Sequence, residues 1–224
     1  MKKKYQSQKN NEAGNALIYV LVAIVLFAAL SFTLTRQTDT DEAGYLSGDQ
    51  AELYASEIIA YAAAAKSTVD QMLFTGSSID DLDFILPGDA AFDTGSNFHK
   101  VFHPLGGGLN YRALRDEMVS DNASFPAGIY AVKKNVEWTE STATDVILSF
   151  YRLQGSVCDA LADKIDGNLG IPIGPNMFDV FTDQADANTL DNSYCPLCID
   201  QFTYVITAGS PSFVCTFYTI LVDR

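Results

Sequence analysis

The sequence predicts an α+β fold in which a long N-terminal helix packs on an antiparallel β-sheet. Three observations carry this prediction. A segment of 23 residues, 13–35, contains no charged side chain. Apolar side chains then recur at helical spacing over 54–72, and alternating apolar segments separated by turns fill the second half of the chain. Strands of this kind need a cover on their apolar face, and the amphipathic helix can supply it.

The charge-free segment is long enough to cross a membrane, because about 20 helical residues span a bilayer core of about 30 Å. Lys2, Lys3, Lys4 and Lys9 precede it, and lysine-rich flanks stay in the cytoplasm. We therefore expect a single-pass topology with a cytoplasmic N-terminus and an extracytoplasmic body.

The distribution of charge limits the partners of the body. The formal net charge is −14, and the leader 1–14 contributes +3, so the chain from Asn15 onward carries −17. An acidic excess of this size repels nucleic acid and anionic lipid, so we expect no nucleic-acid partner. With two histidines in the chain and no recognisable catalytic order of serine, histidine and acid, we expect no enzymatic activity.

The N-terminus allows three interpretations. A secretory signal peptide has an apolar core of about 7–15 residues and a small-x-small exit; here the core is longer, and 31–36 lacks such an exit. A plain signal anchor fits the length and charge. A third interpretation is a leader that is removed after Gly14, which directly precedes Asn15 and the apolar run.

Residues 1–75 resemble the N-terminal part of type IV pilins and type II secretion pseudopilins. The resemblance is carried by the order of leader, glycine and apolar helix, with Gly14 followed by Asn15, Leu17 and Ile18. It implies that a prepilin peptidase cleaves after Gly14, that Asn15 becomes an often methylated N-terminus, and that Leu17, Ile18 and Tyr19 belong to the assembly helix. Most members carry glutamate where this chain has Tyr19, which implies a minor or atypical subunit.

The resemblance divides the chain into the leader 1–14, a transmembrane and assembly helix 15–36, its amphipathic continuation 37–76 and an extracytoplasmic α+β body 77–224. It implies a structural subunit of a type IV pilus or a type II secretion filament, held in the bacterial inner membrane. Its partners would be other pilin-like subunits, met through the N-terminal helix, and the prepilin peptidase. The alternative is a single-pass, membrane-anchored extracytoplasmic domain for binding or thiol redox chemistry.

The amphipathic stripe is spaced at intervals of three and four residues, as one helix face requires. It consists of Tyr54, Ile58, Tyr61, Ala65, Val69 and Met72. Gly76 ends this helix. The helix can thus run from Asn15 to about residue 74, with an interruption near 38–44, and one face of it must find a partner surface.

The remaining elements follow from turn residues and alternation. We expect an acidic loop at 77–98, a glycine-rich turn at 104–108 and a short irregular segment at 113–118. Strands are expected at 128–132, running into 136–138, and at 145–153, joined as a hairpin. A helix over 156–165 with Ser156 as its cap precedes closing strands at 201–208 and 212–222. The sheet is expected to keep a polar outer face.

Four cysteines, Cys158, Cys195, Cys198 and Cys215, lie on the side of the membrane that permits disulfides. Structural disulfides are the preferred interpretation, with three connectivities open. The Cys195–Cys198 spacing of a C-x-x-C motif leaves a redox pair or a zinc site as alternatives.

No cofactor or metal is expected, and calcium is the alternative for the acidic loop. The acidic loop at Asp183, Asp186, Asn188 and Asp191 offers oxygen ligands but lacks the order of an EF-hand. We prefer a solvated acidic loop. His99 and His103 are spaced four apart, but Pro104 and three glycines follow, so a turn is expected there.

Overall fold

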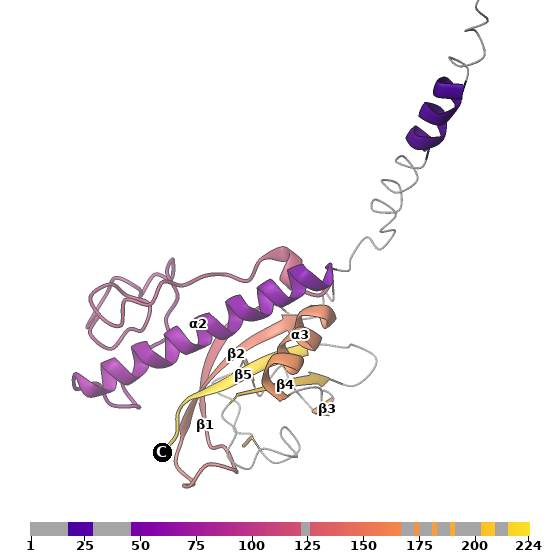
Figure 1. Ribbon diagram of the computed structural model, residues 1–224. Helices are drawn as coiled ribbons and strands as arrows, with labels where there is room; N and C mark the ends of the chain where they lie inside the picture. Colours follow the sequence, from indigo (N-terminus) through magenta and orange to yellow (C-terminus); the bar gives the residue numbers. More distant parts are fainter. Residues whose placement is uncertain are drawn as a thin grey trace, which may run out of the picture. The chain divides into compact units, whose positions relative to one another are not determined.

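The computed structural model in Figure 1 describes residues 18–28, 46–121, 126–166, 173–174, 181–182, 189–190, 203–208 and 215–224. The chain forms two compact units, Met1–Tyr45 and Leu46–Arg224. In the first unit, residues 18–28 are helical, and Ile18 and Tyr19 are 60% and 69% exposed. Among the described residues, no helix combines the length and the apolar character that a membrane crossing requires.

The amphipathic helix, α2, runs from Gly48 to Phe74. Ser47 caps it with extended backbone, and its side chain and that of Gln50 form a reciprocal capping box. An N-cap residue stands outside the helix, so a helix continuing through Ser47 is ruled out. The helix therefore has a break at Ser47. The interruption expected near 38–44 falls on residues 37–45, which lie outside the described part of the chain.

The predicted stripe of α2 is confirmed as the face that enters the core. Its members are buried except Tyr61, which is half-buried. The helix ends as expected, because Thr75 is the C-cap and Gly76 has φ +110°, a conformation that favours glycine. Figure 1 shows α2 and the second helix, α3 (Gly155–Asp166), lying against the sheet.

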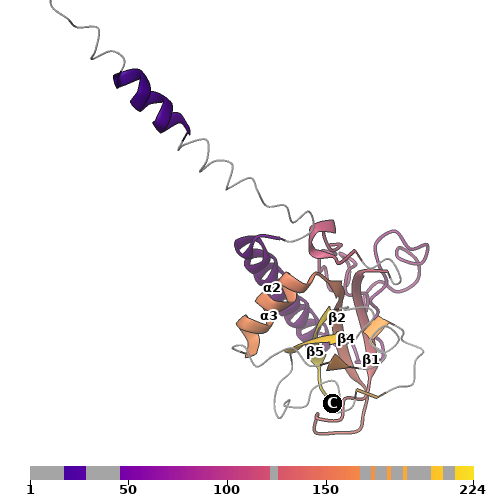
Figure 2. The same cartoon turned by 90° about the vertical axis from the view of Figure 1, so that its right-hand side faces the viewer.

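Five strands form one sheet in the order β1-β2-β5-β4-β3. Their bounds are β1 Gly128–Lys134, β2 Asp145–Leu153, β3 Ile173–Gly174, β4 Thr203–Ala208 and β5 Cys215–Val222. All neighbouring pairs are antiparallel except β3 with β4. The four strands predicted from alternation are thus confirmed, and Figure 2 labels them as β1, β2, β4 and β5. The short parallel β3 is an addition (Figure 1).

Both faces of the central strands are buried, and the expected polar outer face is wrong. In β2, Leu148 and Phe150 join the core beneath α2 and α3, whereas Ile147 and Tyr151 join a second core on the opposite face. Phe181 and Leu190, together with residues near β1, complete that second core. A strand that is covered on both faces carries mostly apolar residues on both, so its apolar and polar residues do not alternate.

A bulge near the end of β2 changes which face its last residue enters. Arg152 has φ +65°, and the register with β5 shifts between Tyr151 and Leu153. One extra residue reverses the alternation. Leu153 therefore joins the core under the helices rather than the second core of Tyr151.

The second helix is joined covalently to the centre of the sheet. Cys158 of α3 forms a disulfide with Cys215 at the start of β5, across 57 residues of sequence. Closing a loop of this length stabilises the fold by roughly 4 kcal/mol in the chain-entropy treatment. Ser156 does not cap this helix as expected. The helix begins at Gly155, and the Gln154 carbonyl accepts from the N–H groups of Val157 and Cys158.

A buried carboxylate fixes the end of the chain to the sheet. Asp145 is fully buried, and its oxygens accept from the backbone N–H of Val136, the hydroxyl of Thr139 and the backbone N–H of Arg224, at 3.1, 3.0 and 2.9 Å. Burial raises the pKa of Asp145 above its ordinary value of 3.8, although these donors oppose the rise.

Asp145→Asn should lower the free energy of unfolding by about 1–3 kcal/mol, because a carboxamide NH2 would face one of these donors. The folded protein binds the Asp145 proton more tightly than the unfolded chain, so its contribution to stability is present at low pH and declines as the pH rises through the raised pKa. Urea unfolding of both proteins at several pH values should show their difference shrinking with rising pH. Asp163→Asn, at an exposed site on α3, is the control. A difference that grows with pH would contradict the assignment.

Candidate functional site

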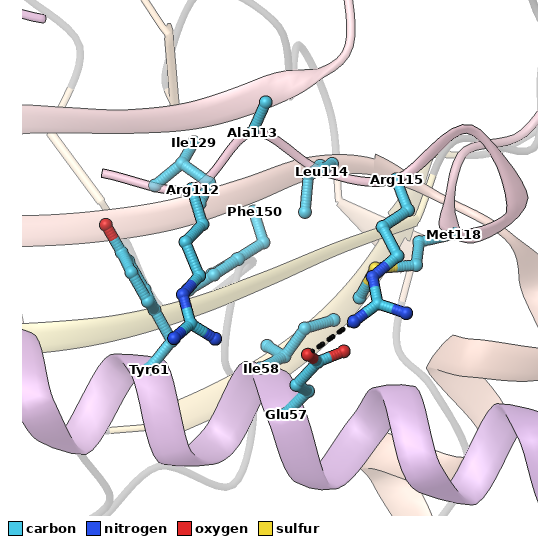
Figure 3. Close-up of a pocket in the computed structure, with 10 residues that line it drawn as sticks. All are labelled: Glu57, Ile58, Tyr61, Arg112, Ala113, Leu114, Arg115, Met118, Ile129 and Phe150. Carbon is cyan, nitrogen blue, oxygen red and sulfur yellow. Dashed lines mark hydrogen bonds and ion pairs between the residues drawn. The ribbon is translucent and has the colours of Figure 1, made fainter. Parts of the chain in front are cut away.

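A groove of about 300 Å³ lies where α2, segment 111–118 and the β1–β2 edge of the sheet meet (Figure 3). Its floor is apolar and comes from four parts of the chain. Ile58 on α2, Met118 after the loop, Ile129 on β1 and Phe150 on β2 are all buried. A volume of this size is at the lower end for ligand pockets, and it matches one large side chain better than a cofactor.

Two arginines form the rim of the groove. Figure 3 shows Arg112 and Arg115 reaching from segment 111–118 toward α2 on either side of Ile58, with Leu114 between them. Arg115 Nη2 donates to Glu57 Oε1 at 2.7 Å, and this pair is partly exposed. The Arg115 guanidinium also lies 5.5 Å from the ring centre of Tyr54, a cation–π distance.

Arg112 differs from Arg115 in forming no ion pair with a carboxylate among the described residues. It is exposed, and within the described part of the chain it forms no ion pair. The body is strongly acidic, since 24 acidic and nine basic residues follow Tyr45. The groove lining carries two cations and one acid, Glu57, and Asp116 and Glu117 directly follow Arg115. The exposed Arg112 is therefore the group at this groove that attracts carboxylates.

Tyr61 closes one end of the groove. Its ring packs edge-on against Phe150 at 6.0 Å, and its hydroxyl is buried without a hydrogen-bond partner among the described residues. Burial raises the pKa of Tyr61 to about 12, and the nearby Arg112 backbone N–H and guanidinium oppose this rise. The hydroxyl is thus a neutral, unpaired polar group at a mainly apolar site.

A second polar cluster lies in the long loop after α2 and is already occupied by a side chain. Lys100 is 4% exposed. Its Nζ donates to the carbonyls of Ala91, Phe92 and Thr94 and to Asn97 Oδ1 at 2.6–2.8 Å. Four oxygens around one centre resemble the surroundings of a metal ion. Here the ammonium supplies the positive charge.

The two histidines of this loop do not form a metal pair. His99 Nδ1 lies 3.0 Å from Ser77 Oγ, and His103 Nε2 lies 3.3 Å from Asp93 Oδ1. His103 Nδ1 accepts from the Leu105 N–H, so its proton is on Nε2. No group of metal-ligating side chains occurs among the described residues.

The structure places only part of the sequence-predicted site residues. Cys158 and Cys215 are brought together as a disulfide, which removes two of the thiolates that a four-cysteine zinc site would need. Ile18 and Tyr19 lie in the helical segment 18–28. The others lie outside the described residues: Gly14, Asn15, Leu17, Cys195, Cys198, Asp183, Asp186, Asn188 and Asp191.

Comparisons of the chain with models of known protein families, with curated proteins and with solved structures give no match. The site is therefore argued from its own geometry. Sequence reasoning missed the groove, because its lining comes from four separate segments. One signal was present: Arg112 and Arg115 are two of nine basic residues after Tyr45 and stand three apart.

Tyr61→Phe should leave the protein at least as stable at pH 7, and by up to about 1 kcal/mol more stable, because it removes an unpaired buried hydroxyl. The raised pKa means that the folded state resists ionisation, so wild-type stability falls as the pH rises from 10 toward about 12. Urea unfolding between pH 7 and 10.5 should show a smaller loss in the variant. Equal losses in both proteins would contradict the assignment.

Lys100→Met should lower the free energy of unfolding by about 3 kcal/mol, because it leaves several buried oxygens without a donor. The effect should be local, so hydrogen exchange of 89–105 should accelerate more than that of β2 and β5. Lys164→Met, at an exposed site on α3, is the matched control and should change little. Uniform acceleration across the sheet would contradict a local role.

Proposed function

We propose that this protein is a pilin-like structural subunit, a minor pilin or pseudopilin, of a type IV pilus or type II secretion filament. The observation that supports it best is the amphipathic helix α2, which follows the charge-free segment and lies with its apolar face on an antiparallel sheet. This is the body that the resemblance of residues 1–75 implies. Processing after Gly14 would create Asn15 as the mature terminus.

The proposed role is structural rather than catalytic. The charge-free helix would hold the subunit in the inner membrane and then pack against the helices of other pilin-like subunits. Tyr19 stands where most members carry a glutamate that pairs with a neighbouring N-terminal ammonium. A tyrosine cannot neutralise that ammonium, and an unpaired charge in an apolar filament core is costly. We therefore assign the chain to a minor or terminal position.

A membrane-anchored binding domain is the second candidate, and the groove beside Arg112 favours it. Such a domain would keep its leader, since anchoring needs no cleavage. The two functions thus differ at the N-terminus, where a single mass measurement separates them. The thiol-redox variant would require Cys195 and Cys198 to cycle, and a thiol count on the native protein tests it.

The full chain, expressed in cells with an active prepilin peptidase, should have Asn15 as its N-terminus. Intact-mass measurement of the membrane-extracted protein should show the loss of residues 1–14, with or without one methyl group. Gly14→Leu should block this cleavage, whereas Glu12→Gln, beside the junction in the leader, should leave it intact. A wild-type protein that keeps Met1 under these conditions would refute the proposal.

A further inference from the structure

The groove requires a partner that carries an apolar group beside a carboxylate. Its floor of Ile58, Met118, Ile129 and Phe150 is apolar, and the exposed Arg112 on its rim forms no ion pair among the described residues. Burying an apolar side chain there removes apolar surface from water, and a carboxylate beside Arg112 supplies the missing charge.

The same body presents this combination at the end of α2. Phe74 is 91% exposed, the largest exposure among the large apolar side chains of the described residues. Asp70 lies one turn earlier on the same helix face, with its side chain 56% exposed. Its ion pair with Lys66 is long at 3.9 Å and exposed, and such pairs contribute little. Phe74 and the weakly paired Asp70 therefore form an exposed aromatic and acidic knob.

The knob and the groove lie on different sides of α2. At 3.6 residues per turn, Phe74 is about 160° around the helix from Ile58. One copy therefore cannot fill its own groove through this helix, and sites that face apart favour head-to-tail joining of two copies over a reciprocal exchange of both knobs. A head-to-tail contact between two copies leaves one knob and one groove free.

We infer that the groove is the docking site for a second copy of this chain, with Phe74 of one copy in the groove of the next and Asp70 facing Arg112. Local charge favours this occupant, because the exposed Arg112 can receive the carboxylate of Asp70, whereas the net charges of two acidic bodies oppose their approach at longer range. The inference deepens the proposed function, and its place in a filament rests on that function. The contact itself is independent of it.

The size of the contact makes it weak for isolated molecules. One phenylalanine buries about 200 Å², whereas a stable interface buries about 800 Å² on each partner. It becomes effective when another contact holds the copies together, because linked sites reach effective concentrations of about 1 mM. Covalent trapping at high concentration is therefore the appropriate measurement.

The full chain in detergent, at about 0.5 mM, is prepared with the photo-crosslinking amino acid p-benzoylphenylalanine in place of Phe74. Equal parts of ¹⁵N-labelled and unlabelled protein are mixed, illuminated and digested. We expect crosslinked peptides that pair the two isotopes and join position 74 to 112–118 or 57–61. The same probe in place of Leu105, which is 75% exposed, should give no such pairs.

Charge variants test the second half of the contact. Arg112→Asp should lower the yield of mixed-isotope crosslinks about tenfold, because it replaces attraction by repulsion worth about 1.4 kcal/mol in total. Combining it with Asp70→Arg should restore the yield. Lys164→Asp, an exposed charge reversal on α3, should leave the yield unchanged. Thermal melting of each variant checks that the body is folded.

The inference is overturned if position 74 gives no mixed-isotope crosslinks to the groove, or if the charge reversal at Arg112 leaves their yield unchanged while the protein is folded. Failure of the proposed function has a different readout, a retained Met1 terminus. A chain processed at Asn15 without groove crosslinks would refute the docking alone. A chain with groove crosslinks but an intact leader would refute the pilin-like role alone.

Discussion

The fold depends on the burial of β2 from both faces. A strand with Leu148 and Phe150 on one face and Ile147 and Tyr151 on the other must be covered twice. The helices α2 and α3 supply one cover, and Phe181 and Leu190, together with Val136, pack against the other face. The groove forms at the edge of the first cover, where α2 no longer reaches over β1 and segment 111–118 takes its place. Packing at the sheet centre thus determines where an open apolar surface remains.

Charge is arranged in two different ways in this body. Asp145 and Lys100 are buried, and each meets three or four hydrogen-bonding groups, so neither charge is isolated. Buried charges persist only with such partners. Arg112 on the groove rim is exposed and has no ion pair among the described residues, although acidic side chains dominate the body. The first arrangement holds the fold together, and the second leaves a cation available to another molecule.

Local patterns in the sequence were sufficient to predict α2, the β1–β2 hairpin and the closing strands, because each depends on a periodicity of its own residues. The boundary at Ser47 and the start of α3 at Gly155 depend on a few local hydrogen bonds, which several nearby polar residues can provide. The second core could not be predicted, because Phe181 and Leu190 come from a segment without clear periodicity. The groove combines four segments, and only the pair Arg112 and Arg115 hinted at it.

The buried ammonium of Lys100 gives the loop after α2 a counter-ion that is part of the chain. A loop organised by calcium loosens when the ion is removed, whereas this one carries its cation through changes of chelator, salt and compartment. Its amine is shielded, so acylating reagents reach Lys100 only during local opening. The rate of acylation of Lys100 therefore reports how often the loop opens. It can be measured on the native protein without any substitution.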